Sequence, residues 1–299
     1  RIVVAQDTKG NDIYAKDLKA VGVMMAILKD AMMPNIVATE DGCLAFIHGG
    51  PFGNIAHGCS SILATRAALT YGDVCITEAG FGADLGAEKF FNIKLRAMNE
   101  GSKEKMWPRL VVIVATLKSI KEQGDGYSNL ARHIENMQSF GCEVVVAINK
   151  FKNDLKKELD ALINYCDNQN VDAFVIDCFG KGKDGGDEIA RHIKGLLKNK
   201  VIPKEKYLYT KKLPIRSKIK AIAKNIYRAK DVVFTKEVET LLKILENSVY
   251  KDFPVCIAKN QYSFTDNEKL LGAPTNHTFH VNDLRLYAGS GFITVYAGK

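Results

Sequence analysis

Three glycine-rich loops are the parts of this sequence best suited to chemistry, because each follows a short apolar run typical of a β-strand. The loops occupy residues 49–54, 78–87 and 178–186. Glycine lets the backbone approach a ligand closely, and free N–H groups at the start of a following helix favour anions. In an open parallel sheet such loops lie at the carboxyl ends of strands, where ligands bind. The pattern therefore predicts a site for an anionic ligand.

Two segments, the second glycine loop and residues 149–150, allow a nucleotide interpretation. Gly80, Gly82 and Gly86 have a spacing one residue longer than the dinucleotide pattern G-x-G-x-x-G, and close backbone packing is the alternative. Asn149 and Lys150 resemble, displaced by one residue, the Asn-Lys-x-Asp corner that reads a nucleotide base. An Asn at a strand end also forms turns without any ligand. A triphosphate loop of the form G-x-x-x-x-G-K-[ST] does not occur in the sequence.

Two histidines, His48 and His57, flank the first glycine loop. They are nine residues apart and lack a third ligand at metal spacing, so no metal site is predicted. Hydrogen bonding within the loop and general acid–base catalysis remain as the two interpretations.

Composition limits the class of protein. With 299 residues, of which 46% are hydrophobic and 25% charged, the chain can bury one large core or two smaller ones. Seven cysteines without a C-x-x-C pair, several inside apolar runs, indicate reduced thiols in a cytoplasmic protein. The net charge of +8 suits anionic small molecules, while no basic run interleaved with aromatics indicates nucleic acid. No apolar run reaches the ~18 residues of a membrane span.

Apolar β-branched runs alternate with amphipathic stretches, which predicts an α/β fold with a parallel sheet covered by helices on both faces. Strands are expected at 2–5, 44–48, 73–77, 110–116, 143–149 and 173–177, and helices at 15–32, 55–69, 84–96, 129–140, 154–165 and 186–198. A different pattern follows residue 200, with helices expected at 215–229 and 236–247 and strands at 254–259, 279–287 and 292–296.

Two long blocks, HGGPFGNIAHG at 48–58 and TEAGFGADLGAEKFF at 77–91, closely resemble the formate–tetrahydrofolate ligase family. Shorter matches extend the resemblance over essentially the whole chain, at 15–19, 114–116, 146–151, 254–259, 261–263 and 285–292. The resemblance implies a P-loop-NTPase-like sheet with smaller C-terminal α/β domains. It also implies ATP-dependent ligation of formate to tetrahydrofolate through formyl phosphate, giving 10-formyltetrahydrofolate for one-carbon metabolism.

Further expectations about partners and organisation come from the same resemblance. They are MgATP, formate and tetrahydrofolate as ligands, a monovalent cation as a candidate cofactor, and a cytoplasmic homotetramer. Residues 1–140 would be the later part of a nucleotide and formyl-phosphate domain. Residues 141–250 would form a folate-side α/β domain, and 251–299 a truncated C-terminal α/β domain.

Particular residues inherit roles from the family. Phe151 falls where the family places a pterin-stacking Phe, and Phe179 where many members have the Trp that covers the other face. The alternative for both rings is that each caps the hydrophobic core. The first loop supplies Phe52 toward folate, Gly50, Gly53 and Asn54 toward formyl phosphate, and Asn54 with His57 as catalytic candidates.

The chain departs from the family at its start and at residues 118–125. The family's triphosphate loop would precede Arg1, so we expect a fragment that is inactive alone. In the segment VATLKSIKEQGD at 114–125, the family's Arg, His and Gly are replaced, and the loop that follows is shorter. An Arg to Lys change loses a bidentate contact to an anion. The rival interpretation is a non-catalytic paralogue that binds folate or a partner subunit.

Overall fold

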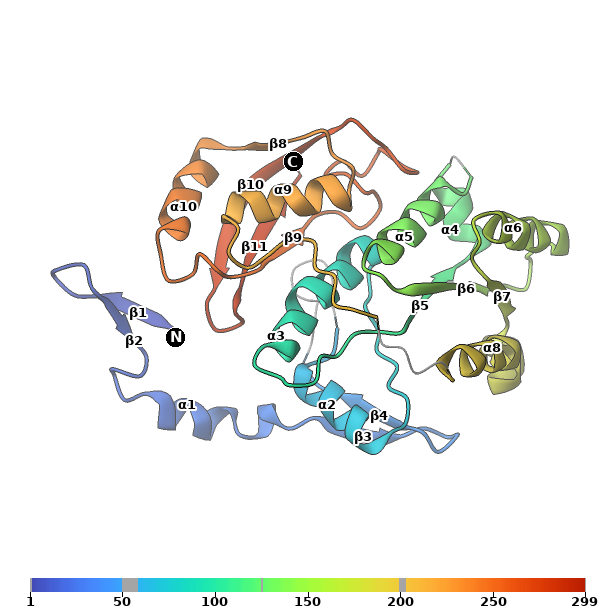
Figure 1. Cartoon of the computed structure of the whole chain (residues 1–299), viewed down its shortest axis with the longest axis horizontal. Coiled ribbons are helices and arrows are strands. Elements are labelled where there is room, and N and C mark those ends of the chain that lie inside the picture. The colour runs from blue at the N-terminus through green and yellow to red at the C-terminus, as the bar shows by residue number, and fades with distance from the viewer. Residues whose placement is uncertain (1, 50–58, 125, 199–202, 299) are drawn as a thin grey trace.

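The computed structural model describes residues 2–49, 59–124, 126–198 and 203–298 (Figure 1). The predicted site residues Gly50, Phe52, Gly53, Asn54 and His57 lie outside these ranges. Within them the architecture is mixed α/β, which confirms the predicted fold class.

A three-stranded parallel sheet carries the candidate functional site described in the next subsection. Its order is β5 (Leu110–Ala115), β6 (Glu143–Asn149) and β7 (Ala173–Ile176). The first and last residues of each strand agree with the prediction to within one residue. Its neighbouring helices are α4 (Leu117–Glu122), α5 (Ser128–Ser139), α6 (Lys156–Asn168), α7 (Cys178–Lys181), η4 (Gly182–Gly186) and α8 (Asp187–Leu197). Alternate residues of β6 are buried on opposite faces. Val144, Val146 and Ile148 join the main core, while Val145 and Ala147 pack with Ile189 of α8. Helices therefore cover both faces of this sheet, as the pattern predicted.

A second sheet has the order β8-β10-β11-β9. Its strands are β8 (Asp231–Phe234), β9 (Val255–Ala258), β10 (Thr278–Tyr287) and β11 (Phe292–Ala297), and its helices are α9 (Ile215–Asn225) and α10 (Lys236–Glu246). Strands β10 and β11 form the predicted antiparallel hairpin, and β8 and β9 add to it in parallel. The pattern missed β8, and α9 ends four residues earlier than predicted, before Arg228 adopts a φ of 58°.

A buried helical segment, residues 83–99, joins the two sheets. It comprises the π-helical turns η2 (Ala83–Ala87) and η3 (Phe90–Leu95) and the α-helical turn α3 (Arg96–Asn99). Phe91 stacks on Phe140 at the end of α5, and Ile93 packs with Cys256 of β9 and Phe292 of β11. The predicted helix at 84–96 is therefore present, but its amphipathic pattern gave no sign of π-helical winding.

The first 76 residues differ most from the prediction. They contain β1 (Val3–Gln6), β2 (Asp12–Tyr14), α1 (Val21–Leu28), η1 (Asp30–Met32), β3 (Asn35–Ala38), β4 (Leu44–Ile47) and α2 (Ile62–Tyr71). The helix predicted at 15–32 is limited to α1 and η1. Strand β4 pairs antiparallel with β3 in a separate sheet, so placing it in the parallel sheet was wrong.

The strand predicted at 73–77 was also wrong. These residues form no ladder, and Ile76 is 94% exposed. A β-branched run becomes a strand only when a neighbouring strand accepts its hydrogen bonds, which the composition of the run does not reveal. Among the described residues, no helix combines the length and apolar character needed to cross a membrane.

Candidate functional site

The candidate site lies at the carboxyl edge of the parallel sheet, where Asn149 ends β6 and Asp177 follows β7. The two strands are parallel neighbours, so the loops that leave them start side by side. Lys150 continues the alignment beyond β6, because its N–H donates to the carbonyl of Ile176 at 2.9 Å. Two predicted aromatic residues, Phe151 and Phe179, therefore sit on adjacent loops at one sheet edge.

Phe151 is held by a turn that Asp154 closes. The Phe151 N–H donates to Asp154 Oδ2 at 2.8 Å, and the Asp154 N–H donates back to the Phe151 carbonyl at 3.0 Å. Phe151 as a whole residue is 49% exposed. The alternative in which Phe151 caps the core therefore fails, since about half of its surface stays in water.

Phe179 lies in the short helix α7 and is fully exposed. Asp177 caps this helix by accepting the Gly180 N–H at Oδ1, at 3.2 Å. An added Cβ at Gly180 would lie 2.7 Å from the same oxygen, so a larger residue there would displace the capping carboxylate. A fully exposed ring contributes nothing to the core, and the core-capping alternative fails for Phe179 as well.

A cation joins the two loops. Lys150 Nζ lies 3.9 Å from Asp177 Oδ2, and both side chains are partly exposed. Such an ion pair contributes at most about 1 kcal/mol to stability. Chemically, the edge offers two exposed aromatic faces beside a lysine, which suits a flat heterocycle that carries negative charge.

The second glycine loop lies elsewhere, against α5 and the loop after β9. Phe81 has a φ of 61° and Gly82 a φ of 84°, and a Cβ at Gly82 would lie 2.7 Å from Asp84 Oδ1 and 3.7 Å from His133. A Cβ at Gly86 would lie 2.0 Å from the Gly80 carbonyl oxygen. The backbone is thus closely packed, and the nucleotide role of Gly80 and Gly82 stays a prediction, like that of Asn149 and Lys150.

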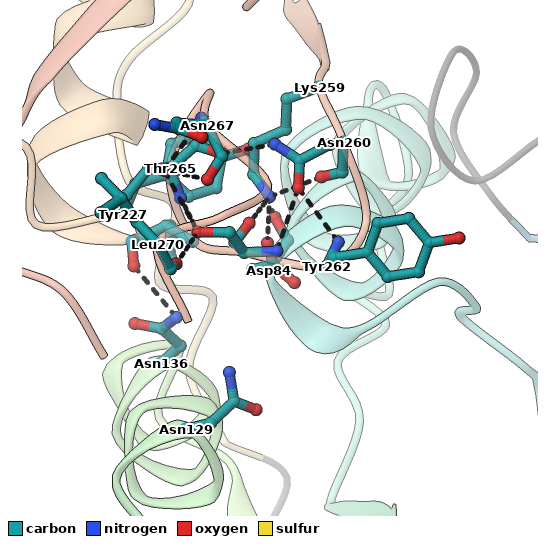
Figure 2. A network of polar contacts seen from close by, with 12 residues as sticks. Asp84, Asn129, Asn136, Tyr227, Lys259, Asn260, Tyr262, Thr265, Asn267 and Leu270 are labelled. Atoms are coloured by element: carbon teal, nitrogen blue, oxygen red, sulfur yellow. Dashed lines mark hydrogen bonds and ion pairs between the residues drawn. The ribbon is translucent and has the colours of Figure 1, made fainter. Parts of the chain in front are cut away.

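A buried ion pair fixes this glycine loop (Figure 2). Lys259 Nζ lies 2.8 Å from Asp84 Oδ2, and it also donates to the carbonyls of Asn260 and Ser263. Three acceptors match the three ammonium protons of Lys259. The Tyr227 ring lies 5.0 Å from the same ammonium group. This network joins the end of β9 to the start of the buried helical segment.

Gln123, within the segment that departs from the family, has a clear structural role. Its Nε2 donates to the carbonyl of Tyr262 at 3.1 Å, and its Oε1 accepts from the Gly272 N–H and from Asn129 Nδ2. The side chain thereby links the loop 259–272 to the end of α4 and the start of α5. In Figure 2 the Tyr262 ring points away from the buried network.

His48 has hydrogen bonds at both ring nitrogens. Nε2 lies 2.7 Å from the Ala31 carbonyl, which can only accept, so the ring proton is on Nε2. Nδ1 lies 2.7 Å from Ser61 Oγ, which also caps α2 by accepting the Ala64 N–H. Both partners lie outside residues 49–54, so these hydrogen bonds join the end of β4 to η1 and α2, and the general acid–base role of His48 stays a prediction. Among the described residues, no three His, Cys, Asp or Glu side chains are placed to hold a metal.

Glu88 is fully buried in the helical segment. Its Oε1 accepts from Asn92 Nδ2 at 2.8 Å, and no described group hydrogen bonds to its Oε2. Burial raises the pKa of Glu88 to about 7, against the opposing effects of the Asn92 hydrogen bond and of the Lys89 and Arg96 charges. The folded chain therefore keeps a proton on Glu88 that the unfolded chain releases near pH 4.5.

This proton makes stability depend on pH. Because the folded state binds it more tightly, the free energy of unfolding should fall as pH rises from about 4.5 to about 7. Glu88→Gln removes the ionisation, so we expect it to raise stability at pH 8 by on the order of 2 kcal/mol and to change it little at pH 4.5. Urea unfolding at both pH values measures this. If the free energies of unfolding of wild type and Glu88→Gln differed by the same amount at both pH values, the raised pKa of Glu88 would be contradicted.

Asp154 and Asp177 were missed by the sequence analysis, although both shape the loops of the predicted rings. The signals were weak. Asp is a favoured residue at helix starts, and Asp177 directly follows a strand while Asp154 opens the helix predicted at 154–165. The partnership of Asp84 with Lys259 left no local signal, because the two residues are far apart in sequence and meet only in the fold.

Comparison with known proteins bears on the whole chain. The sequence model of the formate–tetrahydrofolate ligase family matches residues 1–299. Proteins named formate–tetrahydrofolate ligase are 45% identical in Zymomonas mobilis, 44% in Pelagibacter ubique and 43% in Ruegeria pomeroyi, over 99–100% of this chain. The chain spans 54–56% of the length of these relatives. The predicted resemblance is thus confirmed, and the chain belongs to the formate–tetrahydrofolate ligase family.

Proposed function

We propose that this chain provides the tetrahydrofolate-binding part of an ATP-dependent formate–tetrahydrofolate ligase. The observation that carries the proposal is the placement of Phe151 and Phe179 on adjacent loops at one edge of the parallel sheet, both exposed. Two exposed aromatic faces suit a flat pterin, which would lose contact with water on both sides when it stacks between them.

Positive charge near the rings fits the rest of the ligand. Lys150 and Lys152 flank Phe151, and Lys181 and Lys183 follow Phe179 within four residues. The tail of a folate carries carboxylates, which these ammonium groups attract over a distance of about 10 Å at ordinary salt. The same four lysines would also raise the association rate of an anionic ligand.

The reaction would have two steps. Formate attacks the γ-phosphorus of MgATP, which gives formyl phosphate and ADP. N10 of tetrahydrofolate then attacks the formyl carbon, phosphate leaves, and N10 loses its proton. Both steps depend on positioning and on stabilisation of developing negative charge. In this proposal the amide of Asn54 donates to the formyl phosphate oxygens and His57 exchanges the proton. Gly50 and Gly53 bind formyl phosphate, and Phe52 contacts the folate.

Other parts of the proposal rest on the family alone. They are the cytoplasmic homotetramer, the monovalent cation and the nucleotide contacts of Gly80, Gly82, Asn149 and Lys150. The three-part division at residues 140 and 250 is likewise proposed; the pairing of β5 with β6 crosses the first boundary, and that of β8 with β10 crosses the second. The non-catalytic alternative is less favoured, because the proteins that are 43–45% identical to the chain are named for the ligase activity.

Replacing Phe179 by alanine tests the proposal. In the intact ligase, Phe179→Ala should raise the KM for tetrahydrofolate about tenfold, the scale of one lost stacking face. The KM for ATP should stay nearly unchanged. Phe179→Trp, which enlarges the face, should lower the KM for tetrahydrofolate. Steady-state kinetics with each substrate varied in turn measure this. Equal KM values for tetrahydrofolate in all three proteins would refute the site.

A further inference from the structure

We infer that Asp154 and Asp177 are positioning residues of the pterin site, each fixing the backbone that carries one of the two exposed rings. This inference rests on the proposed function and deepens it. Neither carboxylate would touch the ligand in this scheme. Their contribution would be to hold Phe151 and Phe179 in place before the ligand arrives.

The first ring depends on Asp154. The Phe151 N–H and the Phe151 carbonyl are both hydrogen bonded to residue 154, one to its carboxylate and one to its N–H. Both peptide groups that flank the Phe151 Cα are therefore restrained. Preceding it, Lys150 is bound through its N–H to the Ile176 carbonyl in the neighbouring strand. The ring consequently projects from a backbone that is tied on both sides.

The second ring depends on Asp177. Its carboxylate accepts the Gly180 N–H, its carbonyl accepts the Lys181 N–H at 3.0 Å, and its own N–H donates to the Gly185 carbonyl at 3.0 Å. A Cβ at Gly185 would lie 2.3 Å from the Asp177 carbonyl oxygen, so the returning chain presses directly on this residue. Phe179 lies within the turn that these three bonds enclose.

Exposure explains why such restraints would matter. A ring in the core is oriented by its neighbours, but Phe179 is fully exposed and Phe151 about half exposed, so packing orients them weakly or not at all. Ordering a loop together with its side chains on binding weakens affinity, by about three- to tenfold for each side chain that is fixed. Backbone hydrogen bonds leave the ring rotamers free, but they order the loops in advance and so remove the loop part of this loss.

The test is a double-mutant cycle on tetrahydrofolate binding to this chain, measured by isothermal titration calorimetry. Asp177→Ala should raise the Kd about three- to tenfold, and Asp177→Asn, which keeps a capping oxygen, should stay within twofold of wild type. In a Phe179→Ala background, Asp177→Ala should change the Kd by less than about twofold, because the ring through which it acts is gone. Asp154→Ala and Phe151→Ala form the same cycle.

Two further variants keep the test decisive. Asp184→Ala removes an exposed carboxylate from the same loop and should leave the Kd unchanged, which controls for charge. Gly180→Ala should imitate Asp177→Ala, because its Cβ displaces Asp177 Oδ1, and it serves if Asp177→Ala does not fold. An unchanged Kd in Asp177→Ala, or an equal rise in Kd with and without Phe179, would overturn the positioning role of Asp177 and leave the proposed function standing. Wild-type and Phe179→Ala chains that bind equally, or not at all, would overturn the proposed function.

Discussion

Asp84→Ala is expected to lower the free energy of unfolding by about 3–5 kcal/mol, because it leaves the Lys259 ammonium buried without its counter-charge. The Lys259 side chain is wholly buried and lies 2.8 Å from Asp84 Oδ2. The two remaining carbonyl acceptors are dipoles and compensate a full charge only in part. A domain is usually stable by about 5–15 kcal/mol, so this loss would be a large fraction of the total. Urea unfolding followed by circular dichroism measures it.

A surface ion pair supplies the matched control. Glu122→Ala removes the carboxylate that lies 3.8 Å from Lys118, where both side chains are well exposed, and should cost less than about 1 kcal/mol. Replacing both buried partners, in Asp84→Leu/Lys259→Met, should restore part of the stability. If Asp84→Ala and Glu122→Ala destabilised the chain equally, the buried pair would not be the anchor of the glycine loop.

Asn54→Asp is expected to lower turnover of the intact ligase about a hundredfold or more, the scale of losing one oxyanion donor. The substitution replaces an amide donor by a carboxylate beside an intermediate that is itself an anion. The next described helix, α2, is capped by Ser61, so the competing interpretation is that Asn54 takes no part in the reaction. Asp has nearly the size of Asn and should be tolerated by the fold. The melting temperature should therefore stay normal while turnover falls. Single-turnover kinetics and a thermal melt of the same preparation measure both quantities.

Two neutral variants separate the roles of Asn54. Asn54→Ser and Asn54→Ala both remove the amide without adding a charge. Both should turn over slowly if the amide stabilises charge. Near-normal turnover in Asn54→Asp would mean that the Asn54 amide does not stabilise the intermediate, and the first loop would lose its proposed place at the reaction centre.

The parallel sheet was predictable because its signals are local. A run such as Val144–Ile148, apolar at every position, has to be buried on both faces, and that requirement alone predicts a covered parallel sheet. The hairpin of β10 and β11 was equally clear from two apolar runs around a glycine turn. The strand expected at 73–77 is absent for the converse reason, because the residues of the run do not show whether a neighbouring strand will pair with them.

The site was predictable only in part. Sequence reasoning alone left Phe151 and Phe179 undecided between ligand contact and core capping, and the family resemblance pointed to the ligand. Their exposure, which excludes the core, is a property of the fold. The carboxylates that hold the two loops, Asp154 and Asp177, act through backbone hydrogen bonds that leave only weak sequence patterns. The pairing of Asp84 with Lys259 depends on the packing of two distant segments, which no local pattern reports.

A crystal structure of this chain with tetrahydrofolate bound tests the central claim most directly. We expect a pterin ring stacked between Phe151 and Phe179, with both side chains losing most of their exposed surface. The hydrogen bonds of Asp154 to Phe151 and of Asp177 to Gly180 should persist in the complex. A pterin bound elsewhere, with both phenyl rings still in water, would show that these residues do not form the folate site.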